Sequence, residues 1–263
     1  MHIKDRSFVI SGGASGLGEA TVRDLHAHGG YIAILDLNVD NGERIVRELG
    51  ADRTSFFEVD ISDPESTASA VKKAMTWIKT TGKPIGGVIP AAGVGMPGKL
   101  IDRHNEPIPL DRLEFVLNIN IRGVIDLIRL CLPHMTTTEP TPDDKERGVI
   151  VLVSSSAAFD GQPGQLAYAA SKGAIRSMAL VLARDLAMYG IRCVAIAPGY
   201  FESAMTAAMS QKVRSSLERV LEFPARPGKG TDFAQMVRHC VENVMLNGEC
   251  VRLDGATRMP SRM

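Results

Sequence analysis

Short apolar runs recur along the chain, and each is followed by a longer segment in which apolar residues keep helical spacing. Runs with the composition of buried strands occupy residues 7–11, 31–36, 54–60, 87–93, 148–154, 192–198 and 249–254. Apolar residues at i, i+3 and i+4, which are typical of helices with one buried face, occupy residues 19–28, 40–49, 64–82, 110–135, 168–186 and 233–245. Because apolar strands alternate with amphipathic helices, the pattern predicts a parallel sheet covered by helices on both faces.

The alternation continues without a change in composition, which predicts one doubly wound α/β domain of the Rossmann type over residues 1–263. A Gly- and Pro-rich connection at 94–109 and a polar insertion at 136–147 do not break it. Residues 200–229 have weak periodicity and several Met and Phe residues. This excursion is either a mobile lid over an apolar substrate or a plain helical excursion.

Composition favours no charged partner. Lys and Arg together number 30, as do Asp and Glu, so the chain has no overall electrostatic footprint for nucleic acid or an anionic membrane. No apolar run reaches the roughly 18 residues of a membrane span, and no charged-then-apolar leader precedes Ser7, so we expect neither a span nor a secretory signal. The cysteines form no Cys-x-x-Cys pair and lie in apolar patterns, so we expect buried free thiols and no metal site. They are Cys131, Cys193, Cys240 and Cys250.

A glycine-rich turn joins the first predicted strand to the first predicted helix. Gly12, Gly16 and Gly18 allow a sharp turn and a close approach to a pyrophosphate, which the free N–H groups of a helix N-terminus would bind. The loop alone could be a simple tight turn, but Asp36 ends the second strand about 20 residues later, where an adenosine ribose would be held. Positions 14, 15, 37 and 38 carry no Lys or Arg to neutralise a 2′-phosphate, so we expect NAD rather than NADP.

Tyr168 and Lys172 are candidates for acid–base chemistry. They lie four residues apart at the start of a helical pattern, so both side chains share one helix face. A nearby ammonium lowers the pKa of a phenol, whose ordinary value of about 10 is too high for proton exchange near neutrality. An isolated pair of this kind is more often two solvated surface residues, so the assignment depends on the other motifs.

Several motifs occur together in a fixed order: Gly12-x-x-x-Gly16-x-Gly18, Asp60, Ala92-Gly93, Asn120, Ser155, Tyr168-x-x-x-Lys172 and Pro198-Gly199. They resemble the short-chain dehydrogenase/reductase family along nearly the whole chain. Within that family, residues 161–168, 223–226 and 246–259 look most like the type 2 3-hydroxyacyl-CoA dehydrogenases. Two departures are Pro90-Ala91, where the family usually has Asn followed by Asn or Cys, and Ala256, where it has Gly. Pro90 is also unfavourable in a central parallel strand, so local support of the sheet and cofactor is expected to differ there.

The resemblance implies a proton path through three side chains. Tyr168 would exchange the proton with the substrate oxygen, while Lys172 would lower the pKa of that tyrosine and hold the nicotinamide ribose. Asn120 would anchor a water that leads protons to solvent. Asn118 lies close by, but Asn120 is the position that matches the family pattern.

The resemblance also implies the substrate and cofactor contacts. Ser155 would hydrogen-bond the substrate oxygen because it lies at the family's usual interval before Tyr168, with Ser154 and Ser156 as the alternatives. Gln165 would contact the substrate together with Ser155 and Tyr168. The implied cofactor contacts are Gly12, Ser15, Gly16, Leu17, Gly18, Asp36, Asp60, Ile61, Ala91, Gly93, Tyr168, Lys172, Pro198, Phe201 and Ser203.

The activity that the resemblance implies is NAD-dependent oxidation of a secondary alcohol to a ketone. The leading substrate is a 3-hydroxyacyl-CoA in fatty-acid β-oxidation. A steroid or other alcohol dehydrogenase of the same family is the alternative, because the sequence does not reveal the shape of the substrate loops. The complete catalytic set argues against a non-enzymatic scaffold, and the family's usual assembly is a homotetramer.

The last three residues predict a location. Ser261, Arg262 and Met263 have the small, basic, large-apolar pattern of a C-terminal peroxisomal address. Peroxisomes carry out β-oxidation, so the motif agrees with the expected activity. The alternatives are the mitochondrion, where the resembling animal enzymes reside, and the cytoplasm.

Overall fold

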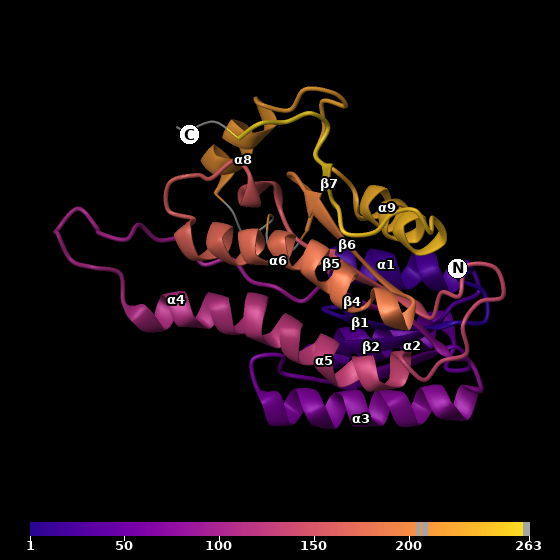
Figure 1. Ribbon diagram of the computed structural model, residues 1–263. Coiled ribbons are helices and arrows are strands. Elements are labelled where there is room, and N and C mark those ends of the chain that lie inside the picture. The colour runs from indigo at the N-terminus through magenta and orange to yellow at the C-terminus, as the bar shows by residue number, and fades with distance from the viewer. Residues whose placement is uncertain (204–205, 207–209, 260–263) are drawn as a thin grey trace.

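Seven parallel strands form the sheet on which the molecule is built, in the spatial order β3-β2-β1-β4-β5-β6-β7 (Figure 1). The computed structural model describes residues 1–203, 206 and 210–259. The expected peroxisomal address at 261–263 and part of the 200–229 excursion therefore lie outside the described residues. The strands are β1 (Ser7–Ser11), β2 (Tyr31–Asp36), β3 (Thr54–Glu58), β4 (Ile85–Pro90), β5 (Gly148–Val153), β6 (Ile191–Pro198) and β7 (Cys250–Leu253).

The direction of winding reverses between β1 and β4. From β1 the chain builds outward through β2 and β3, then returns to place β4 on the other side of β1. Connections that leave in opposite directions open a crevice at the carboxyl ends of these two strands, which is where ligands bind in doubly wound sheets. The predicted doubly wound parallel sheet is confirmed.

Helices cover both faces of the sheet, and each face has its own apolar core. One core packs Val22, Ile45 and Phe233 against the sheet, and the other packs Ala74, Leu127 and Ile175. Figure 1 shows α3 and α5 on one side of the sheet and α1 and α9 on the other. Within the described residues, no helix has the length and hydropathy that a bilayer-spanning segment needs. The first face carries α1 (Gly16–Ala27), α2 (Val39–Leu49) and α9 (Gly230–Glu242), and the second carries α3 (Pro64–Thr81), α5 (Val124–Met135) and α6 (Leu166–Asp185).

The long helix expected over 110–135 is divided by a π-helical turn. Helix α4 (Leu110–Leu117) leads into the turn Asn118–Gly123, which leads into α5. Asn120 lies in this turn with its side chain fully buried. A Cβ at Gly123 would stand 2.5 Å from the carbonyl oxygen of Ile61, so only glycine allows the turn to pack against the loop after β3. Wider turns of this kind are frequent at functional sites.

Helix α9 ends at Glu242, so its predicted extension to Met245 is wrong. The buried guanidinium of Arg192 donates to the carbonyl oxygens of residues 240, 241 and 246 at 2.7–2.9 Å. The carbonyl oxygens of residues 240 and 241 therefore accept from Arg192 instead of from the N–H groups that a continued helix would supply. Asn243 is extended, and Met245 is 86% exposed instead of lying on the buried stripe. Arg192 also pairs with the buried carboxylate of Glu146 at 2.7 Å.

Pro90 fits because it is the last residue of its strand. It lies beside Ser11 of β1, and the next residue, Ala91, donates its N–H to the Ser11 carbonyl oxygen at 3.1 Å. Alternate N–H groups of a strand point to opposite neighbours, so the donor that proline lacks would point toward β5. Pairing between β4 and β5 stops at Val88, two residues earlier. The missing N–H therefore leaves no gap in the ladder.

The expectation of buried free thiols is confirmed for most of the cysteines. Cys131, Cys193 and Cys240 are buried, Cys250 is partly buried, and all four are free. Burial raises the pKa of each of the three buried thiols to about 12, which leaves them unreactive. Among the described residues, no three His, Cys, Asp or Glu side chains gather into a metal-binding cluster.

Arg192→Met should lower the free energy of unfolding by about 3–5 kcal/mol, because it leaves a buried carboxylate and three carbonyls short of a donor. Urea unfolding monitored by circular dichroism measures the change. Arg47→Ala, which breaks the exposed pair with Glu43, is the control and should change stability by less than about 0.5 kcal/mol. Equal urea midpoints for the two variants would contradict this account.

Candidate active site

The four predicted catalytic residues come from three elements that meet at the carboxyl edge of the sheet. Ser155 follows β5, Asn120 lies in the π-helical turn, and Tyr168 and Lys172 occupy the first turns of α6. The ammonium nitrogen of Lys172 lies 5.7 Å from the centre of the Tyr168 ring. The shared helix face expected from their spacing is therefore found, with the cation beside the phenol rather than in solvent.

Burial sets the electrostatics of this pair. Lys172 is 6% exposed, and its Nζ donates to the carbonyl oxygen of Val153 at 2.9 Å. Loss of hydration lowers the pKa of Lys172 to about 8. Burial also raises the pKa of Tyr168 above its ordinary value, and the hydroxyl of Ser155 only partly opposes that shift. The lowered phenol pKa expected from the sequence is thus wrong, because desolvation is the largest influence on Tyr168.

The side chain of Asn120 forms hydrogen bonds with two segments of the site. Its Oδ1 accepts from the N–H of Val94, and its Nδ2 donates to the carbonyl oxygen of Val94, both at 2.9 Å. The second Nδ2 hydrogen goes to the hydroxyl of Ser171 at 3.0 Å, and that hydroxyl donates to the carbonyl oxygen of Tyr168 at 2.7 Å. Both amide donors are used inside the protein, so the side chain positions the loop after β4 against α6.

The three neighbouring serines have different roles. Ser154 donates its hydroxyl to the carbonyl oxygen of Lys172 at 2.8 Å, which ties the end of β5 to α6. Ser155 accepts from the N–H of Ala157 at 3.2 Å, and its hydroxyl interacts with the phenol of Tyr168 and lowers the pKa of that group. Ser156 is buried at the start of a 3₁₀ turn, Ser156–Ala158. The geometry therefore favours Ser155 as the side chain that binds the substrate oxygen.

The glycine loop has the shape that a pyrophosphate requires. Gly12 has a φ of +65°, and a Cβ there would stand 2.7 Å from the backbone nitrogen of Ala92. A Cβ at Gly18 would overlap the carbonyl oxygen of Gly12, so the loop folds onto its own helix. Ser15 precedes α1 without capping it through its side chain, and Leu17 lies in its first turn. The first N–H groups of this helix have no acceptor within it, so an anion would bind at its N-terminus.

Two carboxylates lie along the adenosine side of the crevice. Asp36 ends β2 and accepts from the N–H groups of Ala14 and Asn38 at 2.9 and 3.0 Å. It fixes the glycine loop and keeps further lone pairs for ribose hydroxyls. Asp60 is exposed, and it accepts from both the N–H and the hydroxyl of Ser62, which shapes the turn that contains Ile61.

The loop after β4 is supported by a side chain that the sequence reasoning missed. Ser11 is the one polar residue at the end of the first apolar strand, and its Oγ accepts from the N–H of Ala92 at 3.3 Å. A Cβ at Gly93 would stand 3.3 Å from Oδ1 of Asn120 and 3.4 Å from Nζ of Lys172. Ser11 and Asn120 thus hold the loop where the family's Asn is replaced by Pro90, and Gly93 leaves room beside the catalytic cation.

Residues after β6 and before α6 form the other walls. Pro198 ends β6, and Phe201 packs edge-on against Phe233 with ring centres 6.4 Å apart. The Cβ of Ser203 lies 3.6 Å from where a side chain at Gly16 would begin, so the excursion starts against the glycine loop. Gln165 precedes α6 and forms a backbone bridge with Gly98.

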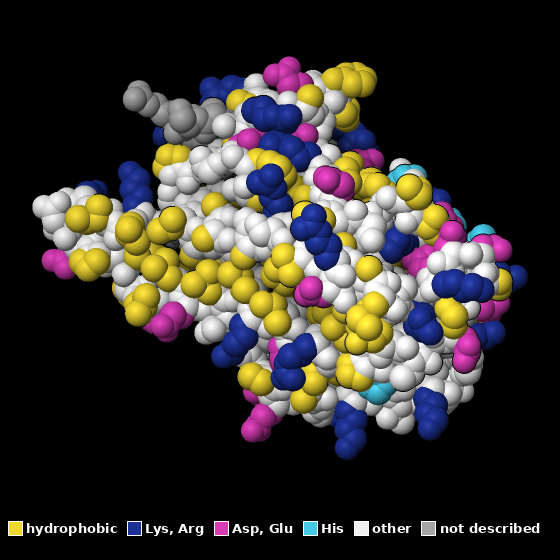
Figure 2. All heavy atoms as spheres, viewed as in Figure 1, with side chains coloured by type: hydrophobic (Ala, Val, Ile, Leu, Met, Phe, Trp, Pro, Cys, Tyr) yellow, Lys and Arg dark blue, Asp and Glu magenta, His cyan; other side chains and the backbone are white. Residues whose placement is uncertain are grey.

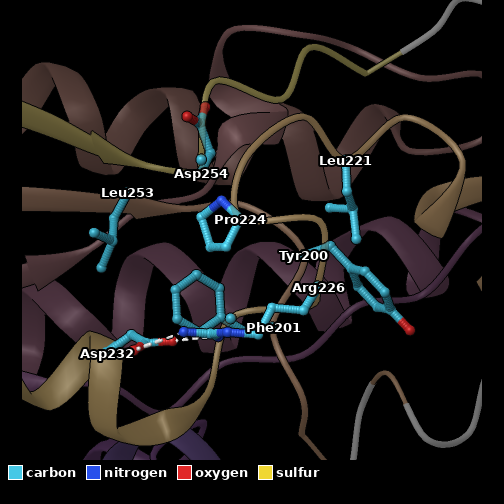
Figure 3. A pocket seen from close by; sticks show the side chains of 10 residues that line it. Tyr200, Phe201, Leu221, Pro224, Arg226, Asp232, Leu253 and Asp254 are labelled. Carbon is cyan, nitrogen blue, oxygen red and sulfur yellow. Dashed lines mark hydrogen bonds and ion pairs between the residues drawn. The ribbon is translucent and has the colours of Figure 1, made fainter.

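The two ends of the 200–229 excursion are joined by a backbone hydrogen bond. The N–H of Gly228 donates to the carbonyl oxygen of Tyr200 at 2.9 Å, and α8 (Gln211–Glu218) lies between these two residues in the chain. A cavity of about 280 Å³ lies beside this hydrogen bond, and its lining includes Phe201, Pro224 and Leu253 (Figure 3). Arg226 closes one side through a 2.7 Å ion pair with Asp232. Tyr168 and Ser155 do not line it, so this cavity is separate from the catalytic edge.

Known proteins share this arrangement. A family model described as short chain dehydrogenase matches residues 6–214. The 3-hydroxyacyl-CoA dehydrogenase type-2 of Drosophila melanogaster is 40% identical over 258 residues, covering 98% of this chain and 99% of that protein. A crystal structure of 3-hydroxyacyl-CoA dehydrogenase type-2 from Mycobacterium avium has a TM-score of 0.88 and 32% identity, covering 97% of this chain and 96% of that chain.

The cofactor class has a parallel among solved structures. A 3-ketoacyl-(acyl-carrier-protein) reductase from Brucella melitensis, solved as a complex with NADH, has a TM-score of 0.82 and 25% identity, covering 98% of this chain and all 100% of that chain. The glycine loop, Asp36 and the Tyr168–Lys172 pair fit such a dinucleotide in the crevice at the carboxyl edge. The chain therefore belongs to the short-chain dehydrogenase family and is an oxidoreductase that uses NAD(H).

Proposed function

We propose that this enzyme oxidises a 3-hydroxyacyl-CoA to the 3-oxoacyl-CoA in fatty-acid β-oxidation. The observation that carries the proposal is the placement of Ser155, Tyr168 and Lys172 on one edge, next to a dinucleotide crevice, in a chain aligned over almost its full length with dehydrogenases of that name. A secondary alcohol is the group that such an edge can oxidise. The acyl-CoA identity rests on the relatives.

Each side chain has a defined part in the chemistry. When bound in the crevice, oxidised NAD would supply the hydride acceptor for the carbinol carbon and a positive charge at this edge. Ser155 donates to the substrate oxygen and holds it against Tyr168, whose phenolate takes the hydroxyl proton as the carbonyl forms. Lys172 supplies a buried cation beside the phenol and donors for the ribose. In reduction, the phenol returns the proton to the oxygen.

A panel of secondary alcohols tests the substrate assignment. NADH formation is measured with 3-hydroxyacyl-CoA thioesters of several chain lengths and with steroid alcohols at equal concentration. We expect the thioesters to give the higher kcat/KM. A steroid preferred over every thioester would replace this proposal with the alternative of a steroid dehydrogenase.

We further propose that the chain assembles as a homotetramer. Support comes from large apolar side chains that are 44–67% exposed along α4, α5 and α6, where Figure 2 shows hydrophobic side chains gathered on one face. They are Leu110, Phe115, Ile125, Leu166, Leu180 and Val181. Light scattering on the purified protein distinguishes four chains from one, and a monomer at micromolar concentration would contradict the assembly.

Tyr168→Phe should reduce turnover by about 10²- to 10⁴-fold, because it removes only the oxygen that exchanges the proton. Binding of NAD, followed by fluorescence titration, should be unchanged. In the parent enzyme, oxidation should accelerate as pH rises, because a phenol whose pKa lies above its ordinary value is mostly protonated at neutrality and only the phenolate accepts a proton. The variant should lose this pH dependence. Retention of half the parent activity would exclude the role of Tyr168.

Asp36→Arg should shift cofactor preference toward NADP. The substitution removes the carboxylate that repels a 2′-phosphate and supplies a cation for it, so the ratio of kcat/KM values should change by at least about tenfold. Asp52→Arg makes the same charge change just before β3, at the amino ends of the strands rather than at their carboxyl ends. It should leave the ratio unaltered. Equal efficiency of the parent enzyme with NAD and NADP would rule out discrimination by Asp36.

We also propose a peroxisomal location, which rests on the tripeptide at 261–263 and on its agreement with β-oxidation. The last ten residues fused to a fluorescent protein should direct it to peroxisomes, and deleting 261–263 from the full chain should leave the enzyme diffuse. A diffuse reporter, or unchanged location of the shortened chain, would remove this proposal and favour mitochondrion or cytoplasm.

A further inference from the structure

The segment that leads from Ser155 to α6 is held by side chains from the end of the chain. We refer to residues 159–165 as the substrate-side loop, because they lie between Ser155 and Tyr168. The ring of Phe159, at the start of this loop, has the guanidinium of Arg176 4.2 Å from its centre and that of Arg252 4.8 Å from it. Two cations on an aromatic ring fix its place in the loop.

The next residue strengthens this attachment. Both carboxylate oxygens of Asp160 accept from Arg252, at 3.0 and 2.6 Å, which is the bidentate geometry that a guanidinium favours. The two side chains are only 15% and 18% exposed, so water screens the pair weakly. The hydrogen bond from Arg252 lowers the pKa of Asp160, and the pair stays ionised at neutral pH. Arg252 lies in β7, 92 positions away in the chain.

The C-terminal tail completes the contact. Arg252 donates to the carbonyl oxygen of Thr257 at 3.1 Å, and the N–H of Met259 donates to Asp160 at 3.3 Å. Nε of Arg252 also donates to Asp254 at 2.6 Å, whose Cβ lies 2.8 Å from where a Cβ at Gly199 would stand. Arg252 therefore connects the carboxyl ends of β5, β6 and β7 with residues 257–259.

The loop held in this way leads in the chain from Ser155 to Tyr168. It contains Gln165, the predicted substrate contact, and Gln162, whose Nε2 is buried without a hydrogen-bond partner in the part of the chain that the structure describes. Its far end is pinned by the hydrogen bond from Gly98 N–H to the carbonyl oxygen of Gly164 at 2.8 Å. The loop is thus attached at both ends, and loss of the contacts at Phe159 and Asp160 would free Gln162, which lies between the two attachments, to move relative to Tyr168.

We propose that Arg252 is a positioning residue for substrate binding. Through Asp160 and Phe159 it holds the substrate-side loop in the place where substrate meets Tyr168, and residues 257–259 are part of the same clamp. The inference rests on the proposed function only for the identity of the substrate. The contacts of Arg252 with Asp160 and Phe159 lie on the substrate-side loop and include neither the glycine loop nor Asp36, so we expect their loss to weaken binding of substrate more than binding of NAD.

Steady-state kinetics on the full-length enzyme separate positioning from folding. Arg252→Lys and Asp160→Asn should each raise KM for the substrate about tenfold while kcat and the Kd for NAD change less than about twofold. The KM of the double variant should be no higher than that of the single variant with the higher KM, because both substitutions break the same contact. Arg238→Lys is the control: it alters the 3.1 Å pair with Asp24 between α9 and α1 and should leave KM unchanged. An unchanged KM in both test variants, or an equal loss in the control, would overturn the proposal.

Hydrogen exchange and truncation test the clamp without any substrate. Amides of residues 159–165 should exchange at least about tenfold faster in Asp160→Asn and in a chain that ends at residue 256, but not in a chain that ends at Met259. Unchanged exchange in the shorter chain would exclude the tail from the clamp. Faster exchange in an enzyme that does not oxidise 3-hydroxyacyl-CoA would leave the clamp standing and refute only the proposed function.

Discussion

The buried carboxamide of Asn120 is the constraint on which the catalytic edge depends. A buried amide that lacks partners costs about 1–3 kcal/mol per missing hydrogen bond, so the fold must bring partners to it. It does so by widening the helix between α4 and α5 into a π-helical turn and by pulling the loop after β4 and the first turn of α6 onto one side chain. Ser171 accepts from Asn120 and donates to the carbonyl oxygen of Tyr168, so Asn120 fixes the position of the catalytic helix relative to the loop after β4.

Burial of the Lys172 ammonium at the same edge costs free energy, because the charge loses its hydration. Lys172 is buried beside backbone and an aromatic ring, and its lowered pKa shows that the protein disfavours the charge there. Its Nζ donates to the carbonyl oxygen of Val153. Chemistry requires the cation in this place, since the phenolate that accepts a proton needs a positive neighbour in a site where water is excluded. Sheet packing elsewhere in the molecule offsets the penalty.

Features set by neighbouring residues could be predicted from the sequence. Most of the strands are apolar runs, the glycine loop follows the first of them directly, and Asp36 ends the second, so the sequence places each within a few residues. Features set by distant partners could not. The end of α9 depends on Arg192, about 50 positions away in the chain, and apolar periodicity does not distinguish a π-helical turn from an α-helix. The direction of the Tyr168 pKa depends on burial, which spacing does not reveal.

The two halves of the site differ in how they are held, and the difference has a physical cause. The dinucleotide half is made of turns that follow directly from β1, β2 and β4, where glycine contacts and backbone hydrogen bonds fix the shape of the loop. The substrate half lies in loops between less regular segments, which have few backbone partners of their own. Such loops need side chains from elsewhere, and here the bidentate contact of Arg252 with Asp160 supplies one from the last strand. Specificity for substrate therefore depends on long-range pairs that can change without disturbing the cofactor crevice.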